Sequence, residues 1–484
     1  MSEKKKTFGS PSSSLPNIKT DFSEWYNYVV YKAELADHAP VRGCIVIKPY
    51  GYALWEEIKK ILDKKIKDTG HENAQFPLLI PEAFLTKEAD HIEGFAPELA
   101  VVTHAGGKKL DEPLVVRPTS ETIIHYMFAQ WIKSWRDLPM KINQWANVVR
   151  WEMRSRPFLR TTEFWWQEGH TAHETADEAL LEAKTMLTEY IDLAQNYLAI
   201  PVVAGKKSES EKFSGADTTF TFEGLMQDGK ALQMGTSHII SQQFAHAFEI
   251  KFQNRQGTES YPFLTSWGAT TRLIGALIMT HGDEKGLIIP PKIAPCQIII
   301  IPIFHKSMAN HEILAAAEKV EDLLKESGLR IKIDRDSESS PGAKFYQWEL
   351  KGVPLRLEIG PRDINEAVVI FTNRITGAKK KVAWGDLKDF AHEELDTIQK
   401  MLFDRALKKR AEKWHKREKL TDFAKDLEEK GGFYQTGWCQ SRECEAILKE
   451  HKASTRCLIE EKTFDTCFNC NAPSVTDVIV ARAY

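Results

Sequence analysis

The segment NVVRWEMRSRPFLRTTEFWWQEGHTA, residues 147–172, places two runs rich in aromatic and β-branched residues on either side of a basic turn at residues 154–157. Two such runs around a short polar turn predict an antiparallel β-hairpin. Side chains two positions apart share one face of a strand, so we expect Arg150 and Glu152 to point the same way.

This hairpin is also rich in charge. Three of its arginines lie a few residues from its glutamates; the two sets are Arg150, Arg154, Arg160 and Glu152, Glu163, Glu168. Arginine suits bidentate contact with phosphate. Guanidinium groups held on rigid strands also stabilise negative charge that develops on a phosphate during a reaction. A solvated pair of charged strands is the alternative interpretation.

Two further segments hold charged residues at the predicted starts of helices. RPTSET, residues 117–122, sets Glu121 beside the hydroxyls of Thr119 and Ser120, and a carboxylate there could hold a substrate's ammonium group. A helix cap with its acid at the favourable end is the alternative. In SWGATTRLIGALIMTHGD, residues 266–283, an apolar core helix explains most positions. Arg272 is the exception, because a buried arginine needs an anion or a carboxylate.

The rest of the chain divides into predicted elements. Residues 52–68 place Leu54, Ile58, Ile61, Leu62 and Ile66 on one helical face. Further predicted elements are a buried strand interrupted by prolines at 76–84, a strand ending at Pro118 and then a helix, a helix at 176–197, and strands within 209–223 and from 229.

After a proline-rich join at residues 290–295, strands and helices alternate. Strands are predicted at 297–303, 329–334, 354–359 and 367–372, with a helix at 313–326, which is typical of a compact α/β domain. Charged helices are predicted from 386 to 429.

Size and composition exclude several classes of protein. A chain of 484 residues predicts two to four domains. The net charge of only -3 excludes binding to nucleic acid by bulk charge, so any RNA must meet local patches. No apolar run is long enough to span a bilayer, and the basic start lacks the apolar core of a secretory signal. We expect a cytoplasmic protein with no membrane partner and a disordered tail at 1–20.

Five of the seven cysteines follow residue 438, which indicates a local site rather than a disulfide framework. Two pairs, spaced CxxxxC and CxxC, are Cys439, Cys444, Cys467 and Cys470. Four thiolates suit a tetrahedral structural Zn²⁺ with no open position for catalysis. Free buried thiols are the alternative, and Cys457 is a rival ligand without a close partner. Cys44 and Cys296 are predicted core residues.

Taken together, these segments resemble class II aminoacyl-tRNA synthetases, and specifically prolyl-tRNA synthetases of the archaeal and eukaryotic type. The resemblance runs from about residue 21 to Tyr484 and includes ELADHAPVRGCIVIKPYGYALWE, RPTSET, the hairpin, ALQMGTSH, SWGATTRLIG and the cysteine-rich end. It implies an α/β (α+β) fold with a class II antiparallel-sheet catalytic domain at 21–290, an α/β anticodon-binding domain at 291–395 and a small zinc-binding domain at 396–484.

The resemblance also implies roles for individual residues. ATP, bound with Mg²⁺, is expected to contact Arg150, Glu152, Arg160, Thr161, Phe164, Gln233, Thr236, Thr270 and Arg272. Among these, Phe164 would stack on adenine, Arg272 would hold the γ-phosphate, and Arg150 and Arg272 would be catalytic. L-Proline is expected to contact Thr119, Glu121, Arg150, Trp166, Glu168, Phe213 and His238.

Proline has an apolar ring and a secondary ammonium, so its pocket needs apolar walls and nearby acceptors. Such a pocket discriminates by only about 1–3 kcal/mol per methylene, and we expect some activation of alanine. Bacterial-type relatives carry an editing insertion between motifs 2 and 3, and the short interval here has no room for it. We therefore expect no hydrolysis of alanyl-tRNA(Pro).

Four further expectations follow from the resemblance. Glu349, Arg356 and Asp363 match positions near the guanines of the proline anticodon, for which surface salt bridges are the alternative. Residues 49–77 resemble motif 1, which forms a homodimer interface. Tyr484 resembles a terminal tyrosine whose carboxylate can approach the active site, and Met234 replaces a small residue, which affects local packing.

Three rival functions would each require a sequence feature that differs from what this chain has. Threonyl enzymes use an active-site zinc, and residues 100–280 hold no Cys/His cluster. Seryl enzymes carry a long N-terminal coiled coil, which this sequence lacks. A synthetase-like RNA-binding regulator tends to lose motif arginines, yet Arg150, Arg160 and Arg272 are present. We therefore expect formation of prolyl-adenylate and transfer of the prolyl group to tRNA(Pro).

Overall fold

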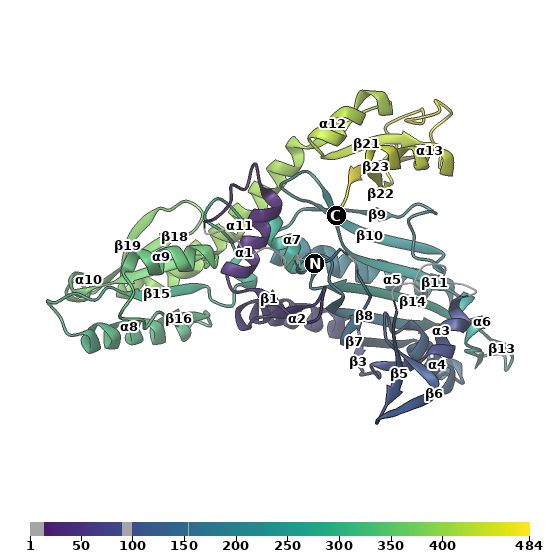
Figure 1. The fold of residues 1–484 in the computed structure, drawn as a ribbon, viewed down its shortest axis with the longest axis horizontal. Helices are drawn as coiled ribbons and strands as arrows, with labels where there is room; N and C mark the ends of the chain where they lie inside the picture. Colours follow the sequence, from purple (N-terminus) through teal and green to yellow (C-terminus); the bar gives the residue numbers. More distant parts are fainter. Residues whose placement is uncertain (1–13, 90–98, 153) are drawn as a thin grey trace, which may run out of the picture.

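A twisted sheet of eleven strands forms the centre of the computed structural model, which describes residues 14–89, 99–152 and 154–484 (Figure 1). Its strand order is β20-β21-β23-β22-β9-β10-β11-β14-β8-β7-β3. Neighbouring strands are antiparallel except in the pairs β3–β7 and β20–β21. The strands from the first half of the chain are β3 (Glu72–Asn73), β7 (Met140–Val149), β8 (Glu163–His173), β9 (Val202–Lys206), β10 (Thr218–Leu225), β11 (Ala231–Ser241) and β14 (Phe263–Thr270).

The predicted hairpin is confirmed as the pair β7–β8, with Val149 opposite Glu163. Because β7 ends at Val149, Arg150 and Glu152 lie in the connection beyond the strand rather than within it. Part of the tail expected at 1–20 and Met153 of the basic turn lie outside the described residues.

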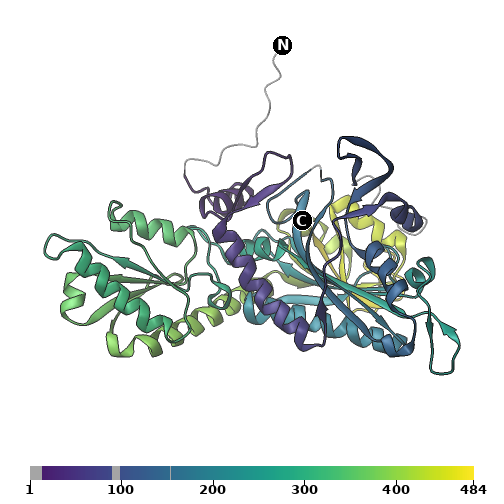
Figure 2. The ribbon, with the colours of Figure 1, turned by 90° about the horizontal axis from the view of Figure 1, so that it is seen from below.

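Helices cover the sheet and bury its apolar side. These are α1 (Phe22–Lys32), α2 (Pro49–Asp68), α5 (Ala176–Asp192) with its π-helical extension Leu193–Tyr197, and α7 (Arg272–His281). The predicted face of α2 is confirmed, since Leu54, Ile58, Leu62 and Ile66 are buried, while Ile61 is half-buried. Viewed from below, this long purple helix runs between the two lobes of the molecule (Figure 2).

A small three-stranded sheet flanks the β7 side, in the order β4-β6-β5. The elements here are β4 (Leu79–Pro81), α3 (Glu82–Ala89), β5 (Ala100–Ala105), β6 (Lys108–Val116) and α4 (Glu121–Trp131). The prediction of a buried strand over 76–84 is wrong in part. β4 is an edge strand of three residues, so Leu79 is 42% exposed, and the chain becomes helical at Glu82.

Short elements complete this lobe. They are β1 (Ala36–His38), β2 (Ile45–Ile47), the 3₁₀-helix Trp135–Asp137, α6 (Gln243–Ala247), β12 (Phe252–Gln253) and β13 (Glu259–Ser260).

The α/β lobe has a mixed sheet in the order β16-β15-β17-β18-β19. Its elements are β15 (Ile298–Pro302), α8 (Asn310–Lys325), β16 (Ile331–Ile333), α9 (Pro341–Leu350), β17 (Leu355–Ile359), α10 (Pro361–Asn365), β18 (Val368–Asn373), β19 (Lys379–Ala383) and α11 (Leu387–Glu412). The predicted strands and helix are confirmed, whereas α9, α10 and β19 were not predicted. The boundary expected after residue 395 falls inside α11.

The C-terminal part extends the central sheet. It contains β20 (Trp414–Lys416), α12 (Ala424–Glu429), β21 (Phe433–Trp438), α13 (Arg442–Ala446), the 3₁₀-helix Ile447–His451, β22 (Ala453–Ile459) and β23 (Thr476–Arg482). The prediction of helices throughout 386–429 is wrong where β20 intervenes. β22 pairs with β9 at Leu458 and Lys206. A Cβ at Gly205 would lie 2.0 Å from the Leu458 oxygen, so only glycine allows this approach.

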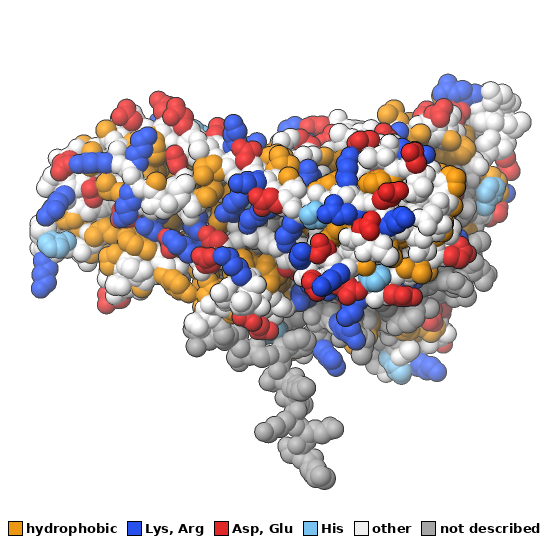
Figure 3. Space-filling view, turned by 90° about the horizontal axis from the view of Figure 1, so that it is seen from above, with side chains coloured by type: hydrophobic (Ala, Val, Ile, Leu, Met, Phe, Trp, Pro, Cys, Tyr) orange, Lys and Arg blue, Asp and Glu red, His pale blue; other side chains and the backbone are white. Residues whose placement is uncertain are grey.

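The surface carries side chains of both charges. Basic and acidic side chains are interspersed on the face seen from above, as the small net charge implies (Figure 3). Within the described ranges, no helix has the length and apolar character needed to cross a membrane.

Candidate active site

A cavity of about 840 Å³ opens over β8, β10, β11 and β14. Its lining brings together every residue that the sequence predicted for ATP or proline. From the ATP set these are Arg150, Glu152, Arg160, Thr161, Phe164, Gln233, Thr236, Thr270 and Arg272. From the proline set they are Thr119, Glu121, Trp166, Glu168, Phe213 and His238, with Arg150 common to both.

One side of the cavity carries guanidinium groups. Arg150 Nε donates to the Pro118 oxygen at 3.0 Å, and its guanidinium carbon lies 5.5 Å and 5.6 Å from the ring centroids of Phe164 and Trp166. Arg160 pairs through Nε with the Glu152 carboxylate. The basic end of the hairpin is therefore organised by ring and carboxylate contacts on the cavity wall.

Arg272, the first residue of α7, completes this side. Its backbone N–H donates to Thr270 Oγ1, its Nε donates to the Leu159 oxygen at 3.1 Å, and its Nη1 donates to the Gln233 oxygen at 3.2 Å. Burial lowers the pKa of Arg272 to about 10, and the nearby charge of Arg150 adds to the effect. Neutral carbonyl oxygens thus orient the Arg272 guanidinium, and its positive charge remains available to attract an anion in the cavity.

Glu168 organises another part of the cavity wall. It accepts hydrogen bonds from Ser120 Oγ at 2.5 Å and from Gln144 Nε2 at 2.8 Å, and lies 3.3 Å from His170 Nε2. Burial raises its pKa, but the contact with His170 and these donors outweigh burial and hold the pKa below its usual value. Ser120 is the N-cap residue of α4, but its hydroxyl makes no cap bond and donates to Glu168 instead.

Glu121 lies beside this network. It is 6% exposed, and among the described residues its Oε2 has no hydrogen-bond partner. Burial raises its pKa above the usual value. An acceptor that is buried and unpaired costs free energy unless a ligand supplies a donor. This geometry suits an ammonium group.

His170 was not predicted from the sequence. A ligand atom from each of Glu121, Glu168 and His170 lies within 4.8 Å of the others, an arrangement that could hold a cation. Burial lowers the pKa of His170, but its contact with Glu168 outweighs burial and raises it overall. The signal that could have found it is its place two positions after Glu168, which puts both side chains on one face of β8.

His238 joins the two halves of the cavity. Its Nδ1 lies 2.9 Å from Thr219 Oγ1, and its Nε2 lies 2.9 Å from Thr236 Oγ1. Burial lowers the pKa of His238 to about 3, so the ring is neutral. The Phe213 ring packs against the His238 ring, with 4.8 Å between the two centroids.

The lining includes other residues that the sequence did not assign to ATP or proline. Among them are Arg156, Lys207, Glu211, Ser266 and Tyr484. Tyr484 donates from its hydroxyl to Asp228 Oδ2 at 2.7 Å, which holds the chain terminus at the cavity. Met234, expected to affect packing, is buried in the main core.

The residues predicted for the anticodon lie in the other lobe. Arg356 Nη2 pairs with Glu358 at 3.1 Å, its Nη1 lies 3.6 Å from Glu349, and its guanidinium lies 3.9 Å from the Phe345 ring. Asp363 accepts from the Gly360 N–H at 2.9 Å and so caps α10. Glu349 and Arg356 are near each other, whereas Asp363 has a local structural partner.

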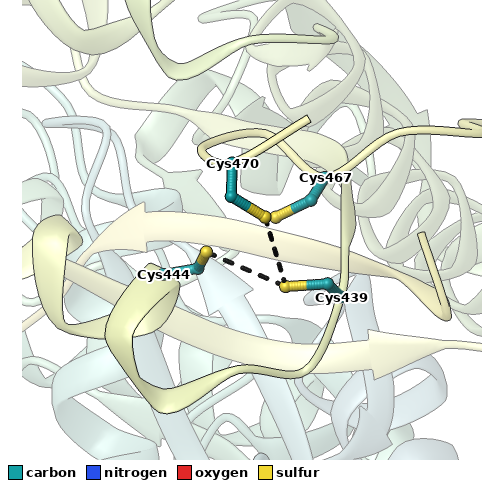
Figure 4. Close-up of side chains that lie close together, drawn as sticks. All are labelled: Cys439, Cys444, Cys467 and Cys470. Carbon is teal, nitrogen blue, oxygen red and sulfur yellow. Dashed lines mark hydrogen bonds between the residues drawn. The ribbon is translucent and has the colours of Figure 1, made fainter. Parts of the chain in front are cut away.

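The four clustered cysteines come from two segments, and their sulfurs converge (Figure 4). Cys439 Sγ lies 3.8 Å from Cys444 Sγ and 3.7 Å from Cys470 Sγ, and the four sulfurs lie within 4.8 Å of one another. Burial raises the pKa of Cys467, but backbone N–H groups outweigh it and hold the value near 7, which favours a thiolate. The set fits tetrahedral Zn²⁺. Cys457 is outside this group and buried in β22.

Comparison with known proteins agrees with this geometry. Family models match the tRNA synthetase class II core domain (G, H, P, S and T) at residues 104–281, an anticodon binding domain at 297–394, and the prolyl-tRNA synthetase C-terminal domain at 420–484.

Relatives match over almost the whole chain. A proline–tRNA ligase of Borreliella burgdorferi is 50% identical over 98% of this chain and 100% of its own. Proline–tRNA ligase 2 of Clostridioides difficile is 49% identical over 97% of this chain and 98% of its own.

Two solved structures of prolyl-tRNA synthetase from Cryptosporidium parvum have the same fold. One, complexed with halofuginone and AMPPNP, matches with a TM-score of 0.92 and 40% identity over 97% of this chain and 99% of that one. The other, complexed with L-proline and AMP, has a TM-score of 0.90 and 39% identity over the same shares. The chain belongs to the prolyl-tRNA synthetase family of class II aminoacyl-tRNA synthetases.

Proposed function

We propose that this chain is a proline–tRNA ligase, which activates L-proline with ATP and transfers the prolyl group to the 3′ end of tRNA(Pro). The observation that carries the proposal is the cavity itself. It joins three guanidinium groups, from Arg150, Arg160 and Arg272, to a wall with a buried acceptor on Glu121 and aromatic rings. ATP and a small imino acid need these two chemistries side by side.

ATP would occupy the side with the guanidinium groups. Arg150 would contact the α-phosphate, Arg272 would hold the γ-phosphate, and Arg160 with Glu152 would cover the nucleotide. Phe164 would stack on adenine, while Thr161, Gln233, Thr236 and Thr270 would contact the nucleotide or its Mg²⁺. Support comes from the orientation of Arg272 by carbonyl oxygens, which leaves its charge available to an anion.

Proline would occupy the wall with the acids. The secondary ammonium would donate to Glu121, while Glu168 and Thr119 would shape the floor of the pocket. Trp166, Phe213 and His238 would enclose the ring. The neutral state of His238 suits an apolar substrate ring, since an imidazolium would add an uncompensated charge.

The reaction then needs positioning and charge stabilisation rather than a covalent enzyme intermediate. The proline carboxylate attacks the α-phosphorus, the bond to the bridging oxygen breaks, and pyrophosphate leaves. A terminal tRNA hydroxyl next attacks the acyl carbon, and AMP leaves with the bonding electrons. Arg150 would neutralise charge on the α-phosphate oxygens during both steps.

The α/β lobe would recognise tRNA, and the cysteine cluster would support the fold of the C-terminal part. The α/β lobe would bind the anticodon of tRNA(Pro), with Glu349, Arg356 and, less directly, Asp363 near the bases. The expected division at residues 21–290, 291–395 and 396–484 is retained as a proposal, with α11 as the link. Cys439, Cys444, Cys467 and Cys470 would hold a structural Zn²⁺, which would stabilise the C-terminal fold.

We also propose a cytoplasmic homodimer formed through residues 49–77. Support comes from Tyr52, an exposed aromatic residue on α2, whose ring centroid lies 6.5 Å from that of the exposed Trp165 on β8. Large exposed apolar side chains that lie close together are typical of protein interfaces.

The test is ATP–pyrophosphate exchange with purified protein. Proline should support rapid exchange, alanine slow exchange, and threonine and serine none above background. Exchange that depends on threonine or serine would assign a sister synthetase, and no exchange with any amino acid would indicate a binding regulator. Alanyl-tRNA(Pro) should persist when mixed with the protein.

A further inference from the structure

The loop at residues 207–213 forms part of the cavity wall and connects β9 to β10. Lys207, Glu211 and Phe213 line the cavity, and the Phe213 N–H donates to Thr219 Oγ1 at 2.9 Å. That hydroxyl also contacts His238 Nδ1. The backbone of this loop is therefore tied to the hydroxyl that contacts His238, and its position sets where the Phe213 ring lies in the pocket.

The loop is held from outside by one carboxylate of the C-terminal part. Glu445, on α13, accepts from Ser208 Oγ at 2.5 Å through Oε1 and from Ser210 Oγ through Oε2. Thr455 on β22 also donates to Glu445 Oε1. Glu445 is 7% exposed, so these hydroxyls replace the water that an ionised carboxylate would otherwise bind.

A second anchor fixes the beginning of the loop. Lys207 Nζ donates to Glu223 Oε1 at 3.1 Å, and Arg456 of β22 binds the same carboxylate through Nη2 at 2.9 Å and 3.2 Å. Glu223 is fully buried. The middle of the loop is thus attached directly to a residue more than two hundred positions later in the chain, and its start is linked to Arg456 through the shared Glu223 carboxylate.

We propose that Glu445 is a positioning residue for proline binding, which acts by holding the 207–213 loop and so placing Phe213. Glu445 follows Cys444 of the cysteine cluster on α13, and the N–H of Cys444 donates to the side chain of Ser441, the N-cap residue of this helix, at 3.2 Å. The inference rests on the proposed function and adds a role in substrate binding for the C-terminal part.

The experiment removes the contact from each side in the full-length, zinc-loaded protein. Ser208→Ala with Ser210→Ala alters the loop alone, and Glu445→Ala alters α13 alone. Each variant should raise the KM for proline in pyrophosphate exchange about tenfold, with kcat and the KM for ATP changed by less than about threefold. The triple variant should show about the same tenfold rise, since both changes break one contact.

Backbone hydrogen exchange provides a readout besides activity, and residues 207–213 should exchange faster in each variant while β9 and β10 stay protected. Glu450→Ala, an exposed site nearby, is the matched control and should match the parent. Unchanged KM for proline in the serine variant, or additive effects in the triple variant, would overturn the inference. If the parent and control themselves lack proline-dependent exchange, the proposed function fails instead.

Discussion

Arg272 Nη1 donates to the backbone oxygen of Gln233 at 3.2 Å, although 39 residues separate them in the chain. Together with the bond from Nε to Leu159, this contact fixes the guanidinium plane at the cavity wall using only neutral acceptors. The charge is therefore oriented in advance of any ligand, which is the arrangement that stabilises a polyphosphate without reorganisation.

Replacing Arg272 by Lys should lower kcat/KM for pyrophosphate exchange about a hundredfold, because an ammonium keeps the charge but loses the planar donors. Arg272→Met should lower it further. The thermal unfolding temperature measured beside the kinetics should change little in either variant. Equal activity of the Lys variant and the parent would show that orientation of the guanidinium is irrelevant.

Arg150→Ala should abolish adenylate formation, with a loss of at least about 10²–10³-fold, since it removes the group proposed to face the α-phosphate. Loss of the bond to the Pro118 oxygen should cost about 1 kcal/mol of stability, so the fold should remain intact by circular dichroism. Arg136→Ala, at an exposed arginine, is the control. Exchange near the parental rate in the Arg150 variant would contradict the assignment.

Glu121→Gln should raise the KM for proline at least about tenfold while the KM for ATP stays close to the parental value. The amide keeps the shape of the side chain but lacks the charge that attracts a secondary ammonium. The control is Glu112→Gln, which makes the same change at an exposed strand position. A rise in both KM values would mean that Glu121 acts on the cavity as a whole.

Metal analysis should find one zinc per chain in the parent and a loss of zinc in Cys467→Ser. The unfolding temperature of that variant should fall, because structural zinc contributes folding free energy. Cys457→Ser is the informative comparison, since Cys457 is buried but lies outside the cluster, and it should keep its zinc. Full zinc content in the Cys467 variant would rule out this ligand set.

His281 makes a prediction about pH. Its Nε2 lies 2.8 Å from the Leu198 oxygen, and burial lowers its pKa to about 3. The unfolded state binds a proton near pH 6.5 and the folded state does not, so stability is lost as the pH falls below about 6.5, until the folded group titrates. At pH 4.5 this one group should cost about 2.5 kcal/mol.

His281→Gln, whose amide can donate to the same carbonyl, should flatten the dependence of unfolding temperature on pH between 6.5 and 4. His305→Gln changes an exposed histidine and should leave the dependence unchanged. Parallel curves for the parent and the His281 variant would show that this residue does not carry the effect.

Patterns that are local in sequence predicted the fold well. The buried face of α2 was predicted because Leu54, Ile58 and Leu62 recur at helical spacing. β4 was misjudged, because whether Leu79 is covered depends on how many neighbouring strands the sheet has, which its own sequence does not encode. The pairing of β22 with β9 could not be predicted from local patterns, because that contact joins distant segments of the chain.

In the candidate site, too, the identities of many residues were predicted, whereas several contacts between them were not. The resemblance assigned the cavity residues position by position, and the cavity brings them together. His170 lies two positions after Glu168 on β8 and so shares its face; it was missed because the spacing alone does not show that this face lines the cavity. Ser120 was given a cap as an alternative role, but a carboxylate forty-eight positions away captured its hydroxyl.

The pairing of β22 with β9 also bears on what happens to a shortened chain. A protein ending before residue 453 would leave the backbone groups of β9 at an open sheet edge and uncover the buried side chains that face Ile479 and Ala481. Exposed edges of this kind recruit strands from other molecules. Premature termination before codon 453 should therefore yield insoluble material rather than a smaller working protein.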